Sequence, residues 1–377
     1  MSHVEIRQVT DSRDLKAFIE VPWAIYRDDP NWVPPLKFER KEAFSEKNPF
    51  FEHARWQAWL AYRDGVPVGR ISAQIDSLYL ELHDAHTGFF GMIEAPEDPE
   101  VFAALFDAAG RWLKEQGMQT ALGPFNLGIN QEIGCLVEGF NSPPYVMMGH
   151  ARPYYDTLIE GQGYEKAQDV LSYELTKEMF ALPDVVQRMV KRQAARMKLR
   201  QVDRKNKAAE LETLRSIFND AWSANWGFVP FTEKEFNAVG KELFMIMPPD
   251  FSWIVEVDGE PAAFMVLIPN LNEVIADLDG RLLPFGWAKL LWRLKVRSPK
   301  TARVALMGVR QKYQNTRLGP ALAFRSIQAL YEPTMKRNME KMEMSWILEQ
   351  NKGIRNIIEK VGGVVSKRYR LYRKSLL

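Results

Sequence analysis

Polar side chains that could bind a phosphate follow an apolar run near the end of the chain. The sequence VALMGVRQKYQNTRLGPALAF, residues 304–324, reads as a strand, a short polar loop and the start of a helix. The first N–H groups of a helix have no partner inside it, and the helix dipole adds positive potential there, so this arrangement suits an anion. Gly319 would let backbone approach such a ligand closely. Phosphate groups fit this loop, whose donors are Gln314, Asn315, Thr316 and Arg317.

The elements that would position this loop occur twice along the chain. WLAYRDGVPVGRISAQI begins at Trp59 and WIVEVDGEPAAFMVLIP begins at Trp253, 194 positions later. Each stretch has an alternating apolar strand on both sides of an Asp-Gly pair, which predicts a β-hairpin. Two further pairs keep the same order: Asn31-Trp32 with Asn225-Trp226, and LIEGQG (158–163) with IIEKVG (357–362). The chain is therefore expected to be a tandem repeat.

Each half of the repeat predicts a similar series of elements. A helical region is followed by the hairpin, a further strand, a long helix, another strand, a closing helix and a final strand. This mixture predicts an α/β (α+β) fold with two tandem domains, each a mixed, mostly antiparallel sheet flanked by helices. The polar, basic and helix-like stretch 177–210 is the predicted junction between domains at 1–176 and 211–377.

Composition limits the classes of protein to which the chain can belong. A length of 377 residues favours two domains, and 46% hydrophobic residues are enough for packed cores. The 50 basic and 48 acidic residues nearly cancel, so no overall field attracts nucleic acid. The single cysteine, Cys135, excludes an internal disulfide framework, and the five histidines lack a metal-binding spacing with a third ligand. No metal site is expected.

The chain is expected to be soluble and cytoplasmic. Its first residues, MSHVEIRQV, lack the basic start and apolar run of a signal peptide. The longest apolar stretch, AAFMVLIP at 262–269, is far shorter than the roughly 20 residues that span a bilayer.

The loop VRQKYQNTRLGPAL resembles the pyrophosphate loop of the GNAT acyltransferase superfamily, whose pattern after a strand is Gln/Arg-x-x-Gly-x-Gly/Ala. Gln314 matches the first position and Gly319 the last, whereas Arg317 stands where the first glycine is expected. Arg317 either narrows the loop or adds a guanidinium for phosphate. The resemblance implies acyl-CoA as cosubstrate, bound by Gln314, Asn315, Thr316, Arg317, Leu318 and Gly319, with its thioester beside the backbone of Met307 and Val309.

A second stretch, WILEQNKGIRNIIEKVGGVV, resembles the next GNAT motif. Asn351 matches the asparagine after its strand and is expected to contact the coenzyme. Ile358 stands where many members carry a tyrosine that protonates the departing thiolate, so that acid is missing from this half. In the first half, GFFGMIEAP is followed by carboxylates at positions 97, 98 and 100, which suit a helix start but would repel pyrophosphate. One acyl-CoA per chain is therefore expected, in the second half.

Longer stretches resemble one family of tandem-GNAT proteins over essentially the whole chain. They are FFGMIEAPED, GPFNLGINQEIG and AWSANWGFVP. This family includes the bacterial ceramide synthases, so the resemblance implies transfer of a fatty acyl group to the amine of a long-chain sphingoid base or its 3-keto form. Two alternatives stay open: acetyl or aminoacyl transfer to a small polar amine by a soluble enzyme, and noncatalytic binding of acyl-CoA or lipid.

Amide formation from a thioester needs a proton acceptor for the amine and donors for the oxyanion. The candidates for the base are Glu132, His150 and Glu349, and Tyr154 and Tyr155 are candidates for protonating the thiolate. Each also has a structural interpretation. Glu132 could hold a turn, His150 could cap the next segment, Glu349 could be a strand-end carboxylate, and the tyrosines could pack in the core.

Two aromatic segments are candidates for the acceptor site. Trp222, Asn225, Trp226 and Phe228 either line an acceptor or acyl tunnel or fasten the first helices of the second domain.

The other segment is LLPFGWAKLLWRLKVRSPK, residues 282–300, which predicts an amphipathic helix. Its apolar face holds Trp287, Leu290, Leu291 and Leu294, opposite Lys289, Arg293 and Arg297. Such a helix suits the anionic cytoplasmic face of a membrane, with Trp287 and Leu291 as substrate or lipid contacts. The alternative is a helix packed on its own domain.

Overall fold

The computed structural model describes residues 3–177 and 184–377. By its internal contacts the chain divides into two compact units. Unit 1 comprises Met1–Val170, Ile275–Gly286 and Lys367–Leu377, and unit 2 comprises Leu171–Val274 and Trp287–Ser366. The predicted ranges 1–176, 177–210 and 211–377 follow the sequence repeat and stay predictions, and residues 178–183 of that junction lie outside the described part.

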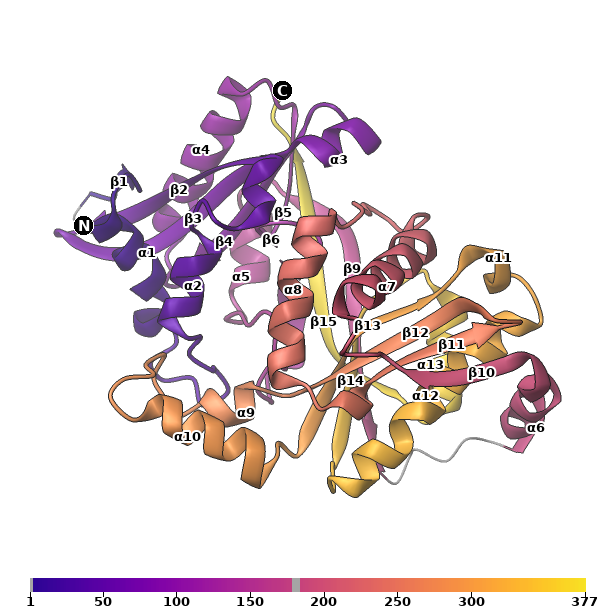
Figure 1. Cartoon of the computed structure of the whole chain (residues 1–377). Coiled ribbons are helices and arrows are strands. Elements are labelled where there is room, and N and C mark those ends of the chain that lie inside the picture. Colours follow the sequence, from indigo (N-terminus) through magenta and orange to yellow (C-terminus); the bar gives the residue numbers. More distant parts are fainter. Residues whose placement is uncertain (1–2, 178–183) are drawn as a thin grey trace. The chain divides into compact units, whose positions relative to one another are not determined.

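Unit 1 is a mostly antiparallel sheet with helices on both faces (Figure 1). Its elements are β1 (Glu5–Gln8), α1 (Ser12–Ile25), α2 (Lys37–Ala43), η1 (Pro49–Glu52), β2 (Ala54–Arg63), β3 (Val66–Asp76), α3 (Ser77–Leu82), β4 (Thr87–Glu94), α4 (Pro99–Glu115), β5 (Thr120–Gly123), β6 (Phe125–Asn126), β7 (Glu132–Ile133), β8 (Cys135–Glu138) and α5 (Tyr155–Glu160). Gly69 faces α4, while Arg70 donates to the Phe18 carbonyl on α1. Because neighbouring strand residues point to opposite faces, α1 and α4 cover opposite sides of β3.

Unit 2 repeats this plan (Figure 1). Its elements are α6 (Asp184–Gln193), η3 (Ala194–Arg196), β10 (Met197–Gln201), α7 (Lys207–Trp222), α8 (Glu233–Ile246), η4 (Pro249–Phe251), β11 (Ser252–Val257), β12 (Glu260–Pro269), β13 (Thr301–Val309), α11 (Gln311–Gln314), α12 (Leu318–Lys336), β14 (Lys341–Leu348) and α13 (Lys352–Lys360). Between β12 and β13 the chain forms α9 (Asn272–Ile275), α10 (Gly286–Trp292) and η5 (Arg293–Arg297). Helices α7, α8 and α12 pack against the central strands β12 and β13.

The two hairpins confirm the predicted tandem repeat. Tyr62 pairs with Pro67 in unit 1, and Glu256 pairs with Pro261 in unit 2, each next to a register shift in the strand before it. The turn residues all have positive φ, with values of 52° and 77° at Asp64 and Gly65 and of 52° and 90° at Asp258 and Gly259. Only a few residue types adopt this conformation readily, which is why Asp-Gly marks both turns. The mixed, mostly antiparallel sheet flanked by helices is likewise confirmed.

The last strand of each sequence repeat belongs to the sheet of the other repeat. The end of β15 (Val364–Ser375) pairs antiparallel with β5 in unit 1, from Tyr372 opposite Gly123 to Ser375 opposite Thr120. In unit 2, β9 (Glu165–Thr176) lies next to β14. Both β9 and β15 contribute residues to both units. The boundaries of the two compact units therefore differ from those of the two sequence repeats at these last strands.

The stretch 177–210 is helical only in part. It contains α6 and η3 but continues into β10, which pairs antiparallel with β11. The basic residues of this strand make it look like a solvated helix in the sequence. In the structure Arg200 is paired with Glu256 on β11, with 2.6 Å between Nε and Oε1. Residues 197–201 of this stretch are thus an edge strand in unit 2, and its last residues begin α7.

Candidate active site

The parallel strands β13 and β14 separate towards their carboxyl ends. They pair only from Thr301–Val304 to Lys341–Met344, although β13 continues to Val309 and β14 to Leu348. Burial changes at the same point: residues 302–304 and 342–344 are buried, whereas 305–307 and 345–348 are half-buried. A register shift in the β12–β13 pairing lies at this position too, because Val266 pairs with Leu306 and Leu267 with Val304. The separation leaves backbone groups and half-buried apolar side chains beside each other.

The corresponding separation in unit 1 is filled by the chain itself. Strands β4 and β5 pair over only three residues, and the chain then continues alongside β4 as β6. The carbonyl of Phe125 occupies the position that a Cβ on Gly91 would take. Asn126 Oδ1 accepts a hydrogen bond of 2.8 Å from the Met92 N–H, and Gln74 donates to the Phe125 carbonyl at 2.6 Å. Backbone of the same unit therefore packs against β4 where its pairing with β5 ends.

The predicted phosphate loop joins β13 to α12 through α11, and Gly319 allows its tight packing. A Cβ on Gly319 would lie 2.6 Å from the carbonyl oxygens of both Tyr313 and Gln314. These are backbone atoms, so they cannot rotate away as a side chain could. In this structure, the absence of a side chain on Gly319 thus lets the backbone of its own loop pack closely against it.

Some donors of the loop are used internally and others are exposed. Gln314 Nε2 donates to the carbonyls of Ala221 and Val309 at 2.9 and 2.8 Å. Thr316 Oγ1 accepts from the Leu318 N–H at 3.1 Å. The side chains of Asn315 and Arg317 are exposed, and neither is hydrogen-bonded or ion-paired to another described residue. Asn315 and Arg317 are therefore the loop side chains that can meet an anion without breaking a contact.

The aromatic segment after α7 reaches the end of β13. Trp222 Nε1 donates to the Met307 carbonyl at 2.8 Å, and its ring stacks on Phe218 with centroids 5.2 Å apart. Two turns follow α7: the Asn225 N–H donates to the Trp222 carbonyl, and the Phe228 N–H donates to the Asn225 carbonyl. Phe228 is buried and Trp226 is half-buried. Two predicted groups, Trp222 and Met307, are thus brought together in unit 2.

Residues after β14 mainly organise α13. Asn351 Oδ1 accepts from the Ile354 N–H at 3.2 Å and so caps the helix. Half-buried Glu349 lies directly after β14, and its carbonyl accepts from Arg355 at 2.6 Å. Ile358 is 1% exposed and belongs to the interior of unit 2. A proton donor in place of Ile358 would have to be supplied by another residue.

The predicted amphipathic helix is formed by α10 and η5, neither of which contains a buried residue. Of the predicted apolar face, Trp287 and Leu291 are 50% and 46% exposed, and their role as substrate or lipid contacts stays a prediction. Leu290 and Leu294 are half-buried, whereas Trp292 and Val296 are exposed. The π-helical turn that starts at Arg293 changes the side-chain spacing only for the residues after Trp292.

In unit 1, Tyr154 and Tyr155 hold the end of β4. Tyr154 donates from its hydroxyl to the Ala95 carbonyl at 2.8 Å. The Tyr155 hydroxyl accepts from the Ala95 N–H at 3.1 Å and donates to Glu94 at 2.7 Å. Burial raises the pKa of Glu94 to about 7, against the lowering effects of Arg70 and of the Tyr155 and Tyr26 hydroxyls. Glu94 was not among the residues predicted from the sequence, although it is the one carboxylate in the apolar strand GFFGMIEAP.

The other two predicted residues of unit 1 have charged partners. His150 Nε2 lies 2.9 Å from Asp29 Oδ2, and burial lowers the pKa of His150 despite that carboxylate. The neutral ring then donates from Nε2 to Asp29, so buried Nδ1 is an acceptor, and no described group donates to it. Glu132 lies 3.6 Å from Arg40. Glu132 and His150 belong to unit 1, whereas Glu349 belongs to unit 2.

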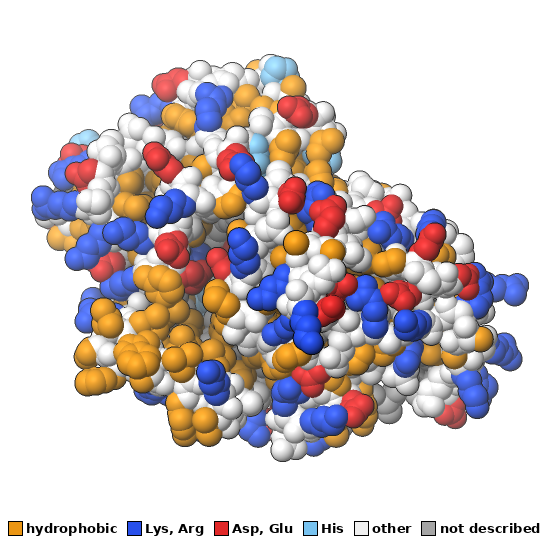
Figure 2. All heavy atoms as spheres, viewed as in Figure 1, with side chains coloured by type: hydrophobic (Ala, Val, Ile, Leu, Met, Phe, Trp, Pro, Cys, Tyr) orange, Lys and Arg blue, Asp and Glu red, His pale blue; other side chains and the backbone are white. Residues whose placement is uncertain are grey.

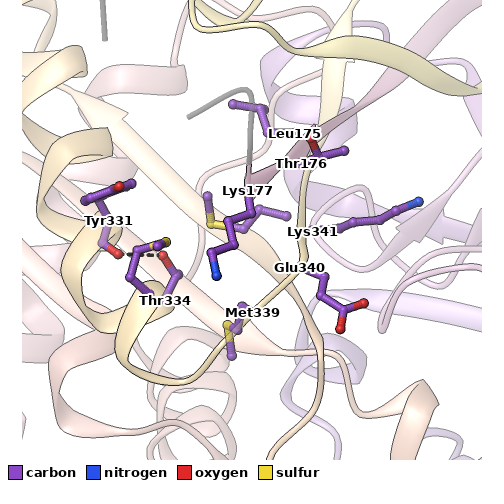
Figure 3. Close-up of a pocket in the computed structure, with 10 residues that line it drawn as sticks. Leu175, Thr176, Lys177, Tyr331, Thr334, Met339, Glu340 and Lys341 are labelled. Atoms are coloured by element: carbon purple, nitrogen blue, oxygen red, sulfur yellow. Dashed lines mark hydrogen bonds between the residues drawn. The ribbon is translucent and has the colours of Figure 1, made fainter. Parts of the chain in front are cut away.

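Unit 2 also has a pocket at the amino end of β14 (Figure 3). Its lining comes from the ends of β9 and α12 and the start of β14: Leu175, Thr176, Lys177, Tyr331, Thr334, Met335, Met339, Glu340, Lys341 and Met342. About 250 Å³ of space, partly open to solvent, lies between them. The strands separate at the other end of β14, so this pocket is distinct from the candidate coenzyme site.

No protein-family model matches the chain. It is 50% identical over 371 residues to protein YghO of Escherichia coli K12, covering 98% of this chain and 95% of that protein. It is 48% identical over 366 residues to the bacterial ceramide synthase of Caulobacter vibrioides, with coverage of 96% and 95%. A solved tandem GNAT protein from the clavulanic acid biosynthesis pathway covers 100% of the chain and 99% of its own length, with a TM-score of 0.57 and 10% identity. At that identity the structural likeness concerns the fold alone. The identity with both relatives, over nearly the whole of each chain, shows that the protein belongs to the tandem-GNAT family that includes the bacterial ceramide synthase of C. vibrioides.

Proposed function

We propose that the chain is an acyl-CoA-dependent N-acyltransferase that transfers a long-chain acyl group to the amine of a sphingoid base or of its 3-keto form. The observation that carries the proposal is the separation of β13 and β14 beside the Gly319 loop, in a chain that is 48% identical to a bacterial ceramide synthase. An opening between parallel strands offers both backbone hydrogen bonds and an apolar wall, which a thioester with a long acyl chain needs.

The acyl-CoA is assigned to unit 2. Its pyrophosphate would lie at the start of α12, where helix N–H groups and the exposed side chains of Asn315 and Arg317 can donate to it. In this assignment Arg317 supplies charge in place of the glycine of the usual pattern. In unit 1, over its described residues, backbone after β5 packs against β4 and carboxylates at 97, 98 and 100 stand where a phosphate loop would be, which supports one acyl-CoA per chain.

The thioester would lie along the end of β13. Backbone N–H groups of β13 that the β14 ladder does not use can donate to the carbonyl oxygen, and this stabilises the negative charge that develops when the amine attacks. Trp222 fixes the adjacent backbone through its hydrogen bond to the Met307 carbonyl. Half-buried apolar side chains at the ends of these strands, from among Leu306, Trp346, Ile347 and Leu348, would contact the acyl chain.

Acceptor-dependent thiol release tests this function. The purified full chain is given palmitoyl-CoA or acetyl-CoA, with and without sphinganine, and free thiol is followed over time. Release that needs both palmitoyl-CoA and the amine is the expected result. Release with acetyl-CoA and a small polar amine instead would favour a small-substrate acetyltransferase, and binding of acyl-CoA without release in any combination would favour a noncatalytic protein.

We also propose that α10 and η5 rest on an anionic membrane surface, where a long-chain amine is found. The exposed fractions are 50% for Trp287, 54% for Trp292 and 67% for Val296, and Leu283 and Phe285 before the helix are 79% and 78% exposed. Figure 2 shows hydrophobic side chains gathered over the place that α10 has in Figure 1. Such large apolar side chains, left exposed together, mark a surface that is covered by a partner.

The charge of the same segment favours anionic lipid as that partner. From Arg281 to Lys300 the chain has no acidic residue and six basic ones: Arg281, Lys289, Arg293, Lys295, Arg297 and Lys300. Basic residues near a membrane surface each contribute about 1 kcal/mol of attraction to anionic lipid, and tryptophan prefers the headgroup layer. In the part of the chain that the structure describes, no helix is long and apolar enough to cross the bilayer.

Replacing both Trp287 and Trp292 with alanine is expected to weaken binding to vesicles of phosphatidylglycerol and phosphatidylcholine by about tenfold or more, because two large apolar contacts are lost. Co-sedimentation measures the effect. Met245→Ala is the control, because Met245 on α8 is 79% exposed and lies outside the basic segment. Equal vesicle binding by the double variant and the control would contradict the membrane assignment.

A further inference from the structure

Trp346 on β14 has a backbone conformation that a large side chain rarely adopts. Its φ is 60°, in the left-handed region where the Cβ of every residue except glycine is crowded. Trp346 comes two residues after Met344, which is the last residue of β14 to pair with β13. Strained residues persist where the surrounding structure holds them, and they are concentrated at functional sites. The strain in β14 thus lies directly where the two parallel strands separate.

The Trp346 ring faces a buried arginine of the neighbouring strand. The guanidinium carbon of Arg303, on β13, lies 5.0 Å from the centroid of the ring. Arg303 is 1% exposed, and its Nε donates to Ser345 Oγ at 2.8 Å, one residue before Trp346. A cation over the face of an indole withdraws electron density from it, which makes the indole N–H a stronger donor. The ring is therefore both held in place and polarised.

The indole N–H of Trp346 has no acceptor among the residues that the structure describes. The Nε1 atom is buried, although Trp346 as a whole is half-buried. An indole nitrogen can only donate, so no change of tautomer provides it with a partner. Because a buried donor without an acceptor is unfavourable, most such groups in native proteins are paired. A ligand that brings an oxygen to this N–H would remove that cost.

Trp56 on β2 of unit 1 shows that an unpaired N–H alone does not define a site. Its Nε1 is also buried, with no acceptor in the described part of the chain. The Trp56 ring, however, stacks on Phe44 and meets Phe18 edge to face inside an aromatic core, and its φ is not positive. Of the two tryptophans, Trp346 alone combines the buried donor with a left-handed backbone and the end of a strand pairing.

We infer that the Trp346 N–H donates to the carbonyl oxygen of the acyl thioester and that Trp346 is a catalytic residue. This role rests on the proposed N-acyltransferase function, which assigns the thioester to the end of β13. Trp346 and Arg303 both belong to unit 2, to which the acyl-CoA is assigned. Donors from both separated strands would then meet at one oxygen: backbone N–H groups from β13 and the indole N–H from β14.

The N–H acts when negative charge develops on that oxygen. The lone pair of the neutral amine attacks the thioester carbon, the C–N bond forms, and the π electrons of the carbonyl move to oxygen. A hydrogen bond to this oxyanion is stronger than one to the carbonyl of the substrate, so it lowers the barrier. The electrons then re-form the carbonyl, the C–S bond breaks, and its electron pair leaves on sulfur. The nitrogen releases one proton to water, and the sulfur takes up one.

The variant Trp346→Phe keeps an aromatic ring next to Arg303 but removes the N–H. At saturating palmitoyl-CoA, kcat with sphinganine is expected to fall about 100-fold or more, as loss of one oxyanion donor does. Trp56→Phe is the matched control, because it removes a buried, unpaired indole N–H in unit 1 and should leave kcat within about twofold of wild type. Equal kcat in the two variants would overturn the role of Trp346.

A thioether analogue separates the lost hydrogen bond from disturbed packing. S-hexadecyl-CoA has a methylene group in place of the thioester carbonyl, so it offers no acceptor to Trp346. In isothermal titration, Trp346→Phe should bind palmitoyl-CoA about fivefold more weakly than wild type, which is the usual effect of one hydrogen bond, and should bind S-hexadecyl-CoA as well as wild type does. An equal loss of affinity for both ligands would contradict the hydrogen bond.

Replacement of Trp346 by 3-benzothienylalanine decides the question if Trp346→Phe fails to fold. This side chain keeps the size and shape of the indole and has sulfur in place of the N–H, so the same fall in kcat is expected. Wild-type kcat in this variant would overturn the role of Trp346. Failure of the wild-type chain to release thiol from palmitoyl-CoA with any amine would refute the acyltransferase function itself, whereas release that does not depend on the N–H would refute only this role.

Discussion

Replacing Gly319 with alanine is expected to weaken binding of palmitoyl-CoA by about 100-fold or more. The new Cβ would lie 2.6 Å from two backbone carbonyl oxygens, those of Tyr313 and Gln314. Relief of this clash must move α11 away from the first turn of α12, and the N–H groups assigned to the pyrophosphate would lose their common direction. Loss of two hydrogen bonds to a charged group costs about 3–6 kcal/mol, which is the source of the expected factor.

The matched control is Gly110→Ala in α4, the helix of unit 1 that corresponds to α12. There the added Cβ would have Leu376 Cδ2 at 3.7 Å, an ordinary contact, so stability should rise by about 0.5–1 kcal/mol and coenzyme affinity should stay unchanged. Isothermal titration with palmitoyl-CoA below its micelle concentration measures both variants. Wild-type affinity in a folded Gly319→Ala protein would contradict the assignment of the loop.

The variant Arg303→Met is expected to lower the free energy of unfolding by about 3–5 kcal/mol, because the buried Glu343 carboxylate would lose the positive charge at the paired position on the neighbouring strand. Arg303 on β13 and Glu343 on β14 occupy paired positions directly before the strands separate, and each is 1% exposed. Arg303 also donates from Nε to Ser345 Oγ at 2.8 Å and lies over the Trp346 ring. The substitution would therefore bury the Glu343 carboxylate beside an apolar side chain.

The double variant Arg303→Met/Glu343→Met separates lost pairing from lost packing. With both charges replaced by apolar groups of similar length, most of the lost stability should return. Arg188→Met is the control, because Arg188 lies exposed on α6 in the same unit and should change stability by less than about 0.5 kcal/mol. Denaturant unfolding measures all three proteins. A double variant no more stable than Arg303→Met would show that the packing of Arg303, and not its charge pairing, dominates.

Local patterns in the sequence were sufficient to predict the repeated hairpins and the loop around Gly319. An Asp-Gly pair between alternating strands specifies a turn with positive φ without knowledge of the rest of the fold. The loop follows a strand directly and leads into a helix, so its position could also be predicted from the neighbouring sequence alone. Its glycine was interpreted as making room for a ligand, whereas its closest neighbours are carbonyl oxygens of the loop itself.

Long-range arrangement could not be predicted in the same way. Strands β9 and β15 have similar alternation, and nothing in either one specifies that each would join the sheet of the other repeat. Glu94 was missed because its importance comes from Tyr155 and Arg70, which are distant in sequence and are brought to it by the fold. The sequence analysis named Tyr155, the donor of this hydrogen bond, but not Glu94, its acceptor.

The measurement that tests the central claim most directly is the mass of the product formed from palmitoyl-CoA and sphinganine by the purified chain. The acyltransferase account predicts N-palmitoyl-sphinganine, formed in step with free coenzyme A, and its loss in Gly319→Ala but not in Gly110→Ala. Free palmitate without the amide, or no consumption of palmitoyl-CoA in the presence of either sphinganine or its 3-keto form, would contradict it.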